Sequence, residues 1–216
     1  MAKSRYYPKA NRTAQWFGNG NYTMSTVSKL LWHTTETAGG WPGYGGGANA
    51  PTLTYDPWKH QWRQHFPLNG SARALSDPGS TAVQENRDSI VQVEISCYCD
   101  PNYAKRYGYG VNDLDSEALD DLADFVVFLH KEWDLPLRNA PKWLPYPQSY
   151  GNSSVRMTSS EFDSFTGIVG HQHASGNDHG DPGSLNVAEI LKRAKNKVAP
   201  AVPKLFGDWW PFPLWS

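Results

Sequence analysis

The segment SIVQVEISCYCD, residues 89–100, constrains the fold more than any other stretch of the chain. In it Val91, Val93 and Ile95 alternate with polar residues, among them Glu94. Successive side chains of a strand point to opposite faces of a sheet, so this pattern predicts a strand with one apolar face. Its other face carries Glu94, and the apolar face must be covered by another layer of structure.

Two later segments have the apolar periodicity of helices that can supply such a layer. In residues 116–133, SEALDDLADFVVFLHKEW, large apolar side chains recur at spacings of three and four. Asp115 or Ser116 can cap its N-terminus. A last helix is expected at 186–197, with Asn186 at its N-cap.

Shorter signals complete the expected sheet. A strand is predicted within 26–36, followed by a glycine-rich loop at 37–51. Two short strands, within 52–57 and 59–67, are separated by a turn, and a short helix is expected near 159–165. Strands interleaved with helices indicate an α/β domain with a central mixed sheet flanked by helices.

Composition narrows the possible partners. The chain has 216 residues, with 20 Lys and Arg against 21 Asp and Glu. This length fits one domain, and the charge balance gives no reason to expect a nucleic-acid partner. No apolar stretch approaches the ~18 residues that a membrane helix needs, and the basic start lacks the apolar core of a secretory signal. We therefore expect a monomer that is made in a cytoplasm and not inserted in a membrane.

We divide the chain into three parts. Residues 1–25 are expected to be irregular, residues 26–197 to form the domain, and residues 198–216 to be a Pro-rich linker with an aromatic tail. This tail either docks on the domain or begins a further module.

Aromatic residues are abundant, with 10 Trp and 11 Tyr. Both side chains combine an apolar ring with a polar edge, so those at the surface are suited to contact with sugar or peptide. Ordinary core packing is the alternative for most of them.

Residues 170–183, GHQHASGNDHGDPG, concentrate metal-binding side chains in a loop that is poor in core-forming residues. A catalytic zinc ion takes three protein ligands and keeps one position open. His171 and Asp181 can provide two ligands, and His33, at the end of an apolar strand, can provide the third. The alternatives are a plain polar loop with adventitious metal affinity and a core histidine at position 33.

Three motifs, LLWHTTE, VQVEIS and GHQHASGNDHGDPG, occur in the order found in zinc-dependent N-acetylmuramoyl-L-alanine amidases. The chain resembles this family over residues 25–195. Phage endolysins, bacterial wall amidases and peptidoglycan-recognition proteins share its fold. The WPGYGGG loop and the NDHGDPG ending most resemble the amidase domains of actinobacteriophage (mycobacteriophage-type) lysin A endolysins.

The resemblance implies a zinc cleft on one side of the sheet, with one zinc ion held by His33, His171 and Asp181. It implies that Glu94 transfers protons and that His179 stabilises the oxyanion, in a place where many members have a lysine. A lysine stays charged at neutral pH, whereas histidine side chains ordinarily titrate near ~6.5. The implied substrate is peptidoglycan, cut at the amide between N-acetylmuramic acid and L-alanine.

Several assignments stay open at this point. Trp41 and Tyr44 of the glycine-rich loop are candidates for substrate binding, or the loop is only a flexible surface segment. Some members have an active-site tyrosine after this loop, and Tyr55 does not align clearly with it. His173 could replace His171 as the ligand or add a fourth one.

Other functions compete with the amidase. Glu94 could be an ordinary strand carboxylate paired with a base such as Arg87. The chain could be a non-catalytic peptidoglycan-recognition module, a structural zinc protein or a cytoplasmic wall-recycling amidase. We expect an endolysin without a signal peptide that reaches the cell wall after release through a holin-made pore.

Overall fold

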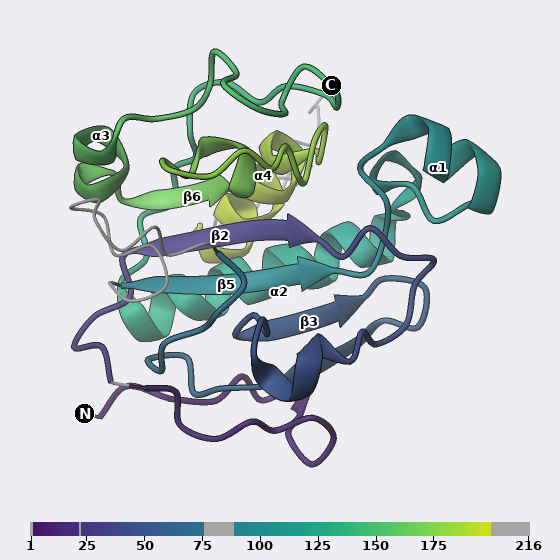
Figure 1. The fold of residues 1–216 in the computed structure, drawn as a ribbon. Helices are drawn as coiled ribbons and strands as arrows, with labels where there is room; N and C mark the ends of the chain where they lie inside the picture. Colours follow the sequence, from purple (N-terminus) through teal and green to yellow (C-terminus); the bar gives the residue numbers. More distant parts are fainter. Residues whose placement is uncertain (1, 22, 76–88, 200–216) are drawn as a thin grey trace, which may run out of the picture.

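A six-stranded mixed sheet forms the centre of the molecule (Figure 1). The computed structural model describes residues 2–21, 23–75 and 89–199. Within these ranges the strand order is β1-β4-β3-β5-β2-β6. Strands β3, β5, β2 and β6 run parallel, and β4 pairs antiparallel with β3. The predicted α/β architecture with a mixed sheet is therefore confirmed.

The strands agree with the predicted segments in the centre of the sheet and add two at its edges. Their bounds are β1 Ala10–Asn11, β2 Lys29–Thr34, β3 Leu53–Asp56, β4 Gln61–Gln64, β5 Ile90–Ile95 and β6 Gly167–Gly170. The segments 26–36, 52–57, 59–67 and 89–100 each contain one strand, as predicted. The strands β1 and β6 were not predicted, because one has two residues and the other is four residues bounded by glycines.

The helices include one that the sequence signals did not indicate. Their bounds are α1 Pro101–Tyr107, α2 Ser116–Trp133, α3 Ser159–Ser164 and α4 Val187–Val198. Helix α1 buries none of its residues, so it has no apolar periodicity that could announce it. The described part of the chain also contains three 3₁₀ turns, η1 Tyr44–Gly47, η2 Val111–Asp113 and η3 His171–His173.

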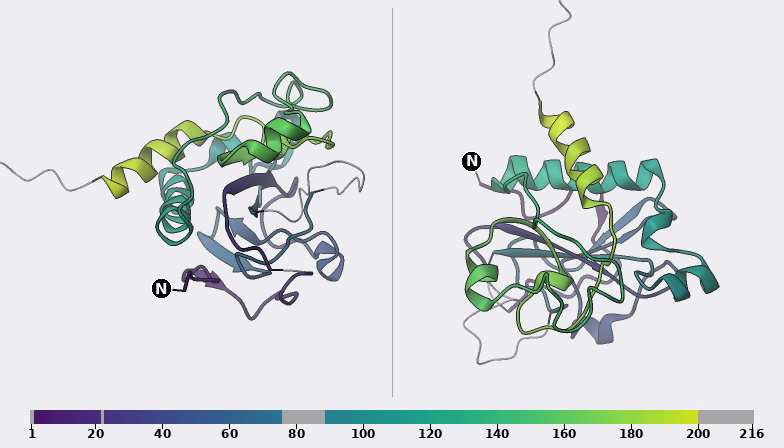
Figure 2. Two further views of the ribbon diagram at one scale, coloured as in Figure 1. Left: turned by 90° about the vertical axis from the view of Figure 1, so that its left-hand side faces the viewer. Right: turned by 90° about the horizontal axis from the view of Figure 1, so that it is seen from above.

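Helices α2 and α4 pack on the same face of the sheet (Figure 2). Asp115 caps α2 by accepting a hydrogen bond from the Ala118 N–H at 2.8 Å, as its position predicts. Leu122, Phe125 and Leu129 of α2 are fully buried in one cluster with the apolar side chains of β5. Each such side chain stabilises the fold by about 1.5–3 kcal/mol through burial.

Side-chain alternation on β2 decides which face carries the chemistry. Leu30 and Trp32 belong to the core cluster beneath α2, whereas Leu31 belongs to a second cluster on the other side of the sheet. His33 has the parity of Leu31, so it lies on the face opposite α2 and α4.

The N-terminal segment is mostly irregular but packs on the domain. It contributes β1, which pairs with β4, and Tyr7, which is 3% exposed and contacts the rings of Trp62 and Phe125. Most of the expected linker and tail, from residue 200 onward, lies outside the described residues. Among the described helices, none combines the length and apolar character required to cross a bilayer.

Candidate metal centre

The two central strands place His33 and Glu94 side by side. His33 of β2 is the register partner of Glu94 of β5. Because these strands are parallel, both residues lie near the same carboxyl edge of the sheet, where α/β proteins commonly place their sites. They also share one face, the face opposite α2.

The third element is β6, which brings His171 to the same edge. Gly170 at its end pairs with Trp32, so His171 follows directly beside the end of β2. A Cβ atom at Gly170 would lie 2.6 Å from the Trp143 ring and 2.7 Å from Cδ of Pro182, so this close approach requires glycine. The loop then returns to place Asp181, whose carbonyl accepts from the Gln172 N–H at 2.9 Å.

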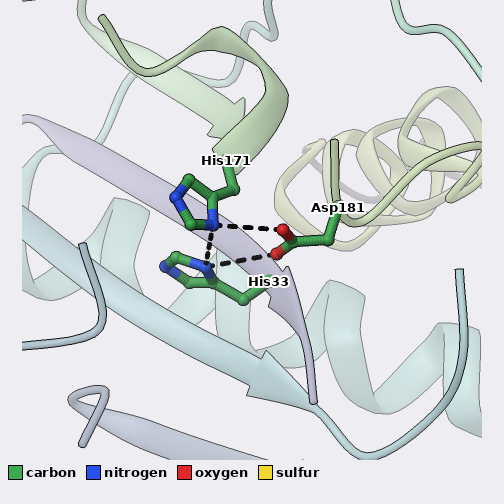
Figure 3. A group of neighbouring side chains, drawn as sticks. All are labelled: His33, His171 and Asp181. Atoms are coloured by element: carbon green, nitrogen blue, oxygen red, sulfur yellow. Dashed lines mark hydrogen bonds and ion pairs between the residues drawn. The ribbon is translucent and has the colours of Figure 1, made fainter. Parts of the chain in front are cut away.

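His33, His171 and Asp181 converge on one point (Figure 3). The two Nδ1 atoms are 3.1 Å apart, and the Asp181 oxygens lie 3.3 Å from Nδ1 of His33 and 3.1 Å from Nδ1 of His171. A tetrahedron with metal–ligand bonds of 2.0–2.1 Å has edges of about 3.3–3.4 Å. The triangle of donor atoms therefore has nearly the size of one face of a tetrahedral zinc site.

Neighbouring groups orient two of the three candidate ligands. Nε2–H of His171 donates to Oδ1 of Asn177 at 3.0 Å, so in the neutral ring Nδ1 keeps a lone pair toward the other candidate ligands. The Asn177 amide is oriented in turn, because its Nδ2 donates to the Ser175 carbonyl at 3.1 Å. The Thr34 N–H donates to Oδ2 of Asp181 at 3.2 Å. The sequence motifs did not identify Asn177 or Thr34.

Burial and the charges of neighbouring groups shift the pKa values of the three side chains in different directions. Burial lowers the pKa of His33 to about 4, so its ring is neutral at pH 7. Burial alone would raise the pKa of Asp181, but the two histidines hold it well below its usual range. For His171 burial acts downward and the Asp181 carboxylate outweighs it, so its pKa is raised. A carboxylate and imidazole nitrogens in this arrangement are suitable ligands for zinc.

Glu94 lies in the same cavity as the three ligands. This cavity has a volume of about 390 Å³ and is also lined by Tyr44 and His179. Oε2 of Glu94 is buried and has no hydrogen-bond partner among the described residues, and burial followed by the charge of Asp181 raises its pKa well above the ordinary value. Arg87, the alternative partner, lies outside the described residues.

His179 lies at the mouth of the site. Its ring stacks on that of His171, with centroids 4.8 Å apart and planes 19° from parallel, and its side chain is 66% exposed. Nδ1 of His179 is 3.9 Å from Oδ1 of Asp181. The ring is thus beside the triangle of candidate ligands and accessible to solvent.

The structure separates His173 from the triangle. Its Nδ1 accepts from the Gly170 N–H at 2.9 Å, and its Nε2 donates to the Lys142 carbonyl at 2.8 Å. Both ring nitrogens therefore have backbone partners, and the ring packs against Trp143 at 4.6 Å. His171, rather than His173, faces His33 and Asp181.

Tyr44 lines the cavity, and a chain of hydrogen bonds connects its hydroxyl to Thr54 and His65. Nδ1 of His65 lies 2.8 Å from the Gln15 carbonyl, which can only accept, so Nδ1 carries the hydrogen and Nε2 accepts. Thr54 Oγ1 donates to that Nε2 at 2.8 Å and accepts from the Tyr44 hydroxyl at 2.7 Å. Thr54 is the register partner of Glu94. The sequence motifs did not identify Thr54 or His65.

The other two aromatic candidates lie elsewhere. The Arg63 guanidinium covers the Trp41 ring at 4.2 Å, and Trp41 does not line the metal cavity. The Tyr55 hydroxyl donates to Asp121 of α2 at 2.8 Å, on the opposite side of the sheet from His33.

Comparisons with known proteins place the fold among solved structures. The chain matches no protein-family model and no curated protein sequence. It is similar to the crystal structure of the Staphylococcus aureus hydrolase AmiA in complex with its ligand, with a TM-score of 0.52 and 15% identity over 88% of this chain and 83% of that chain. It is also similar to a structure of selenomethionine AmpD, with a TM-score of 0.52 and 10% identity over 89% and 98% of the two chains. These likenesses support the fold class inferred from the sequence.

Proposed function

We propose that this protein is a zinc-dependent N-acetylmuramoyl-L-alanine amidase. It hydrolyses the amide between N-acetylmuramic acid and the L-alanine of the stem peptide, with residues 26–197 as its catalytic domain. The observation that carries the proposal is the convergence of His33, His171 and Asp181 beside Glu94 in one cavity. The three-motif resemblance and the fold shared with a hydrolase support it.

The ligand set favours a catalytic rather than a structural zinc site. Structural sites usually close with four ligands, often cysteines. Here the described residues form one cluster of three ligands, and His173 is held by backbone groups. Zinc bound there would supply Lewis-acid chemistry, which polarises the scissile carbonyl.

The residues around the ligands have complementary roles in hydrolysis. Oε2 of Glu94 accepts a proton from the attacking water and delivers it to the leaving amine nitrogen, which balances the reaction. Ionisation of Glu94 is favoured beside a divalent cation, which opposes the effects of burial and of Asp181. His179 donates a hydrogen bond to the developing oxyanion from the mouth of the site.

The biological role follows from the resemblance to lysins. We propose an endolysin that acts as a monomer on peptidoglycan after release from the cytoplasm of a phage-infected host. The WPGYGGG and NDHGDPG segments support this role over wall recycling.

Digestion of purified peptidoglycan followed by mass spectrometry tests the reaction. The expected products are stem peptides with a free N-terminal alanine and intact glycan chains, and a zinc chelator should stop their release. E94Q should lower turnover by about 10²–10⁴-fold while zinc binding remains.

E161Q is a matched control. Glu161 is an exposed carboxylate that caps α3, and glutamine can make the same capping contacts. Its activity should equal that of the unmodified protein. Peptidoglycan that binds the protein but yields no free alanine terminus would refute the amidase and indicate a recognition module.

A further inference from the structure

A second cavity, of about 530 Å³, opens next to the metal cavity. Glu36, His179 and Asp181 line both, so the two cavities meet at the candidate metal centre. A substrate cut at the metal centre can therefore extend into both. Tyrosines dominate the remaining lining of the second cavity, namely Tyr98, Tyr103, Tyr107, Tyr146 and Tyr150.

Three of these tyrosines, Tyr103, Tyr107 and Tyr150, are exposed. Among the described residues the exposed large hydrophobic side chains are Tyr103, Tyr107, Tyr109 and Tyr150, and all except Tyr109 line this cavity. Scattered exposed aromatic rings need no explanation, but a concentration of them in a concave surface indicates a binding site. Figure 1 shows α1, which carries two of them, beyond the carboxyl ends of β2 and β5.

Three of the rings form an ordered group. Tyr103 and Tyr107 lie one helical turn apart on α1, with ring centroids 6.1 Å apart and planes 15° from parallel. The ring of Tyr98 lies 5.7 Å from Tyr103 and 5.9 Å from Tyr107, at 19° and 30°. Aromatic rings grouped in this way offer a large apolar surface, which suits a ligand with an apolar face better than a compact charged group.

The ionisable groups around the rings indicate which charge a bound ligand can carry. Apart from Asp181, whose charge a bound zinc ion would offset, the lining contains the carboxylates of Glu36 and Asp100, with His179 as its one basic side chain. Arg106 is not part of the lining, but its guanidinium lies 5.0 Å from the centre of the Tyr107 ring. Oε1 of Glu36 is positioned by Thr34 Oγ1 at 2.6 Å and by the Cys99 N–H at 2.9 Å. Carboxylates accept hydrogen bonds from hydroxyl and amide groups and repel anions.

This combination fits the sugar part of peptidoglycan and not its stem peptide. The glycan is a chain of pyranose rings that have apolar faces, hydroxyl groups and N-acetyl groups. The stem peptide carries free carboxylates, which the acidic lining would repel.

We propose that the tyrosine-lined cavity binds neutral N-acetylhexosamine units of the glycan, stacked on Tyr98, Tyr103 and Tyr107. This inference rests on the proposed function, since it takes peptidoglycan as the substrate. It places the glycan, which is attached on one side of the scissile amide, between the metal centre and α1.

Binding of a soluble neutral glycan tests the proposal without requiring catalysis. The probe is the N-acetylglucosamine tetramer, titrated into the zinc-loaded protein and followed by calorimetry or by NMR of the tyrosine rings. Y103A and Y107A should each weaken binding by about three- to tenfold, as expected for loss of one stacked ring. Y103F should bind almost normally, because it keeps the ring.

Y109A is the matched control. Tyr109 is also exposed, but its ring packs against Trp58 and lies outside the cavity, so the tetramer should bind this variant normally. The proposal is wrong if the tetramer does not bind up to its solubility limit, or if it binds Y103A and Y107A as well as the unmodified protein. A lysine-containing stem tripeptide that binds in place of the tetramer, and is lost in the same variants, would also overturn it.

The outcomes separate this proposal from the enzymatic one. Tetramer binding that depends on the tyrosines, in a protein that releases no alanine termini, would leave the glycan site standing without the amidase. Amidase activity without tetramer binding would leave the amidase standing without the glycan site.

Discussion

Replacing Asn177 with alanine should weaken zinc binding although Asn177 is not a ligand. Its Oδ1 accepts the Nε2–H of His171 at 3.0 Å, and in the neutral ring this contact keeps the hydrogen on Nε2 rather than on Nδ1. In N177A the hydrogen can move to Nδ1, where it competes directly with a metal ion. The His171 ring also loses a restraint on its orientation.

The expected size of the effect follows from the type of contact. Partners that fix the tautomer of a ligand histidine typically contribute 10–100-fold in metal affinity, or about 1.4–2.7 kcal/mol. For N177A we expect a loss of zinc affinity near the lower end of this range. Asp181 lies 3.1 Å from Nδ1 of His171 and still restrains the orientation of the ring. N177D keeps an acceptor at the same place and should bind zinc at least as tightly as the unmodified protein.

Competition with a chromophoric zinc chelator measures this affinity directly. The assay needs no substrate, so its result does not depend on the proposed reaction. Equal zinc affinity of N177A and the unmodified protein would refute the inference that Asn177 prepares His171 for metal binding. Weaker binding by N177D than by N177A would refute the role of the acceptor.

Three further predictions concern the histidines. H33A should lower zinc affinity by more than the ~100-fold typical of residues that only orient a ligand, because it removes a proposed ligand. An unchanged affinity in the chelator competition assay would contradict this prediction. H173A should lower the free energy of unfolding in urea by about 1–3 kcal/mol, because the Gly170 N–H and the Lys142 carbonyl lose their partner, while zinc affinity changes less than in H33A. Burial lowers the pKa of His65 to about 4, so between pH 6.5 and 4 the unfolded chain binds more protons at this residue than the folded one, and stability falls as pH falls through that window. Between pH 7 and pH 4 the free energy of unfolding of the unmodified protein should fall by up to about 3 kcal/mol more than that of H65Q. Urea titrations of both proteins at the two pH values measure this difference, and equal losses would contradict the assignment.

The sequence predicts the core of this fold well because its long elements have strong periodicity. Helix α2 has the predicted bounds, and the expected alternation of β5 places its valines beneath α2 and Glu94 in the cavity. Helix α1 was not predicted, because it lacks such periodicity. It is held by the Asp100 cap and surface tyrosines, and it has no buried face to produce a pattern.

The same distinction applies to the site. His33, His171 and Asp181 lie in recognisable motifs, and the structure brings them together. The choice between His171 and His173 could not be made from spacing, because both follow Gly170 within three residues. It depends on which ring meets backbone groups, and that is decided by the distant Lys142 carbonyl.

The geometry of the triangle also indicates why these three residues are collected in a buried place. Asn177 directs a lone pair of His171 Nδ1 inward, and the carboxylate of Asp181 offers lone pairs only. A single proton on Nδ1 of His33 can be donated to one of these neighbours, although both lie within 3.3 Å of it. Nε2 of His33 has no partner among the described residues, so it can carry a hydrogen instead and leave Nδ1 as a third lone pair. When His171 is neutral, as metal binding requires, three lone pairs face one point at tetrahedral spacing, and a divalent cation would satisfy all three at once.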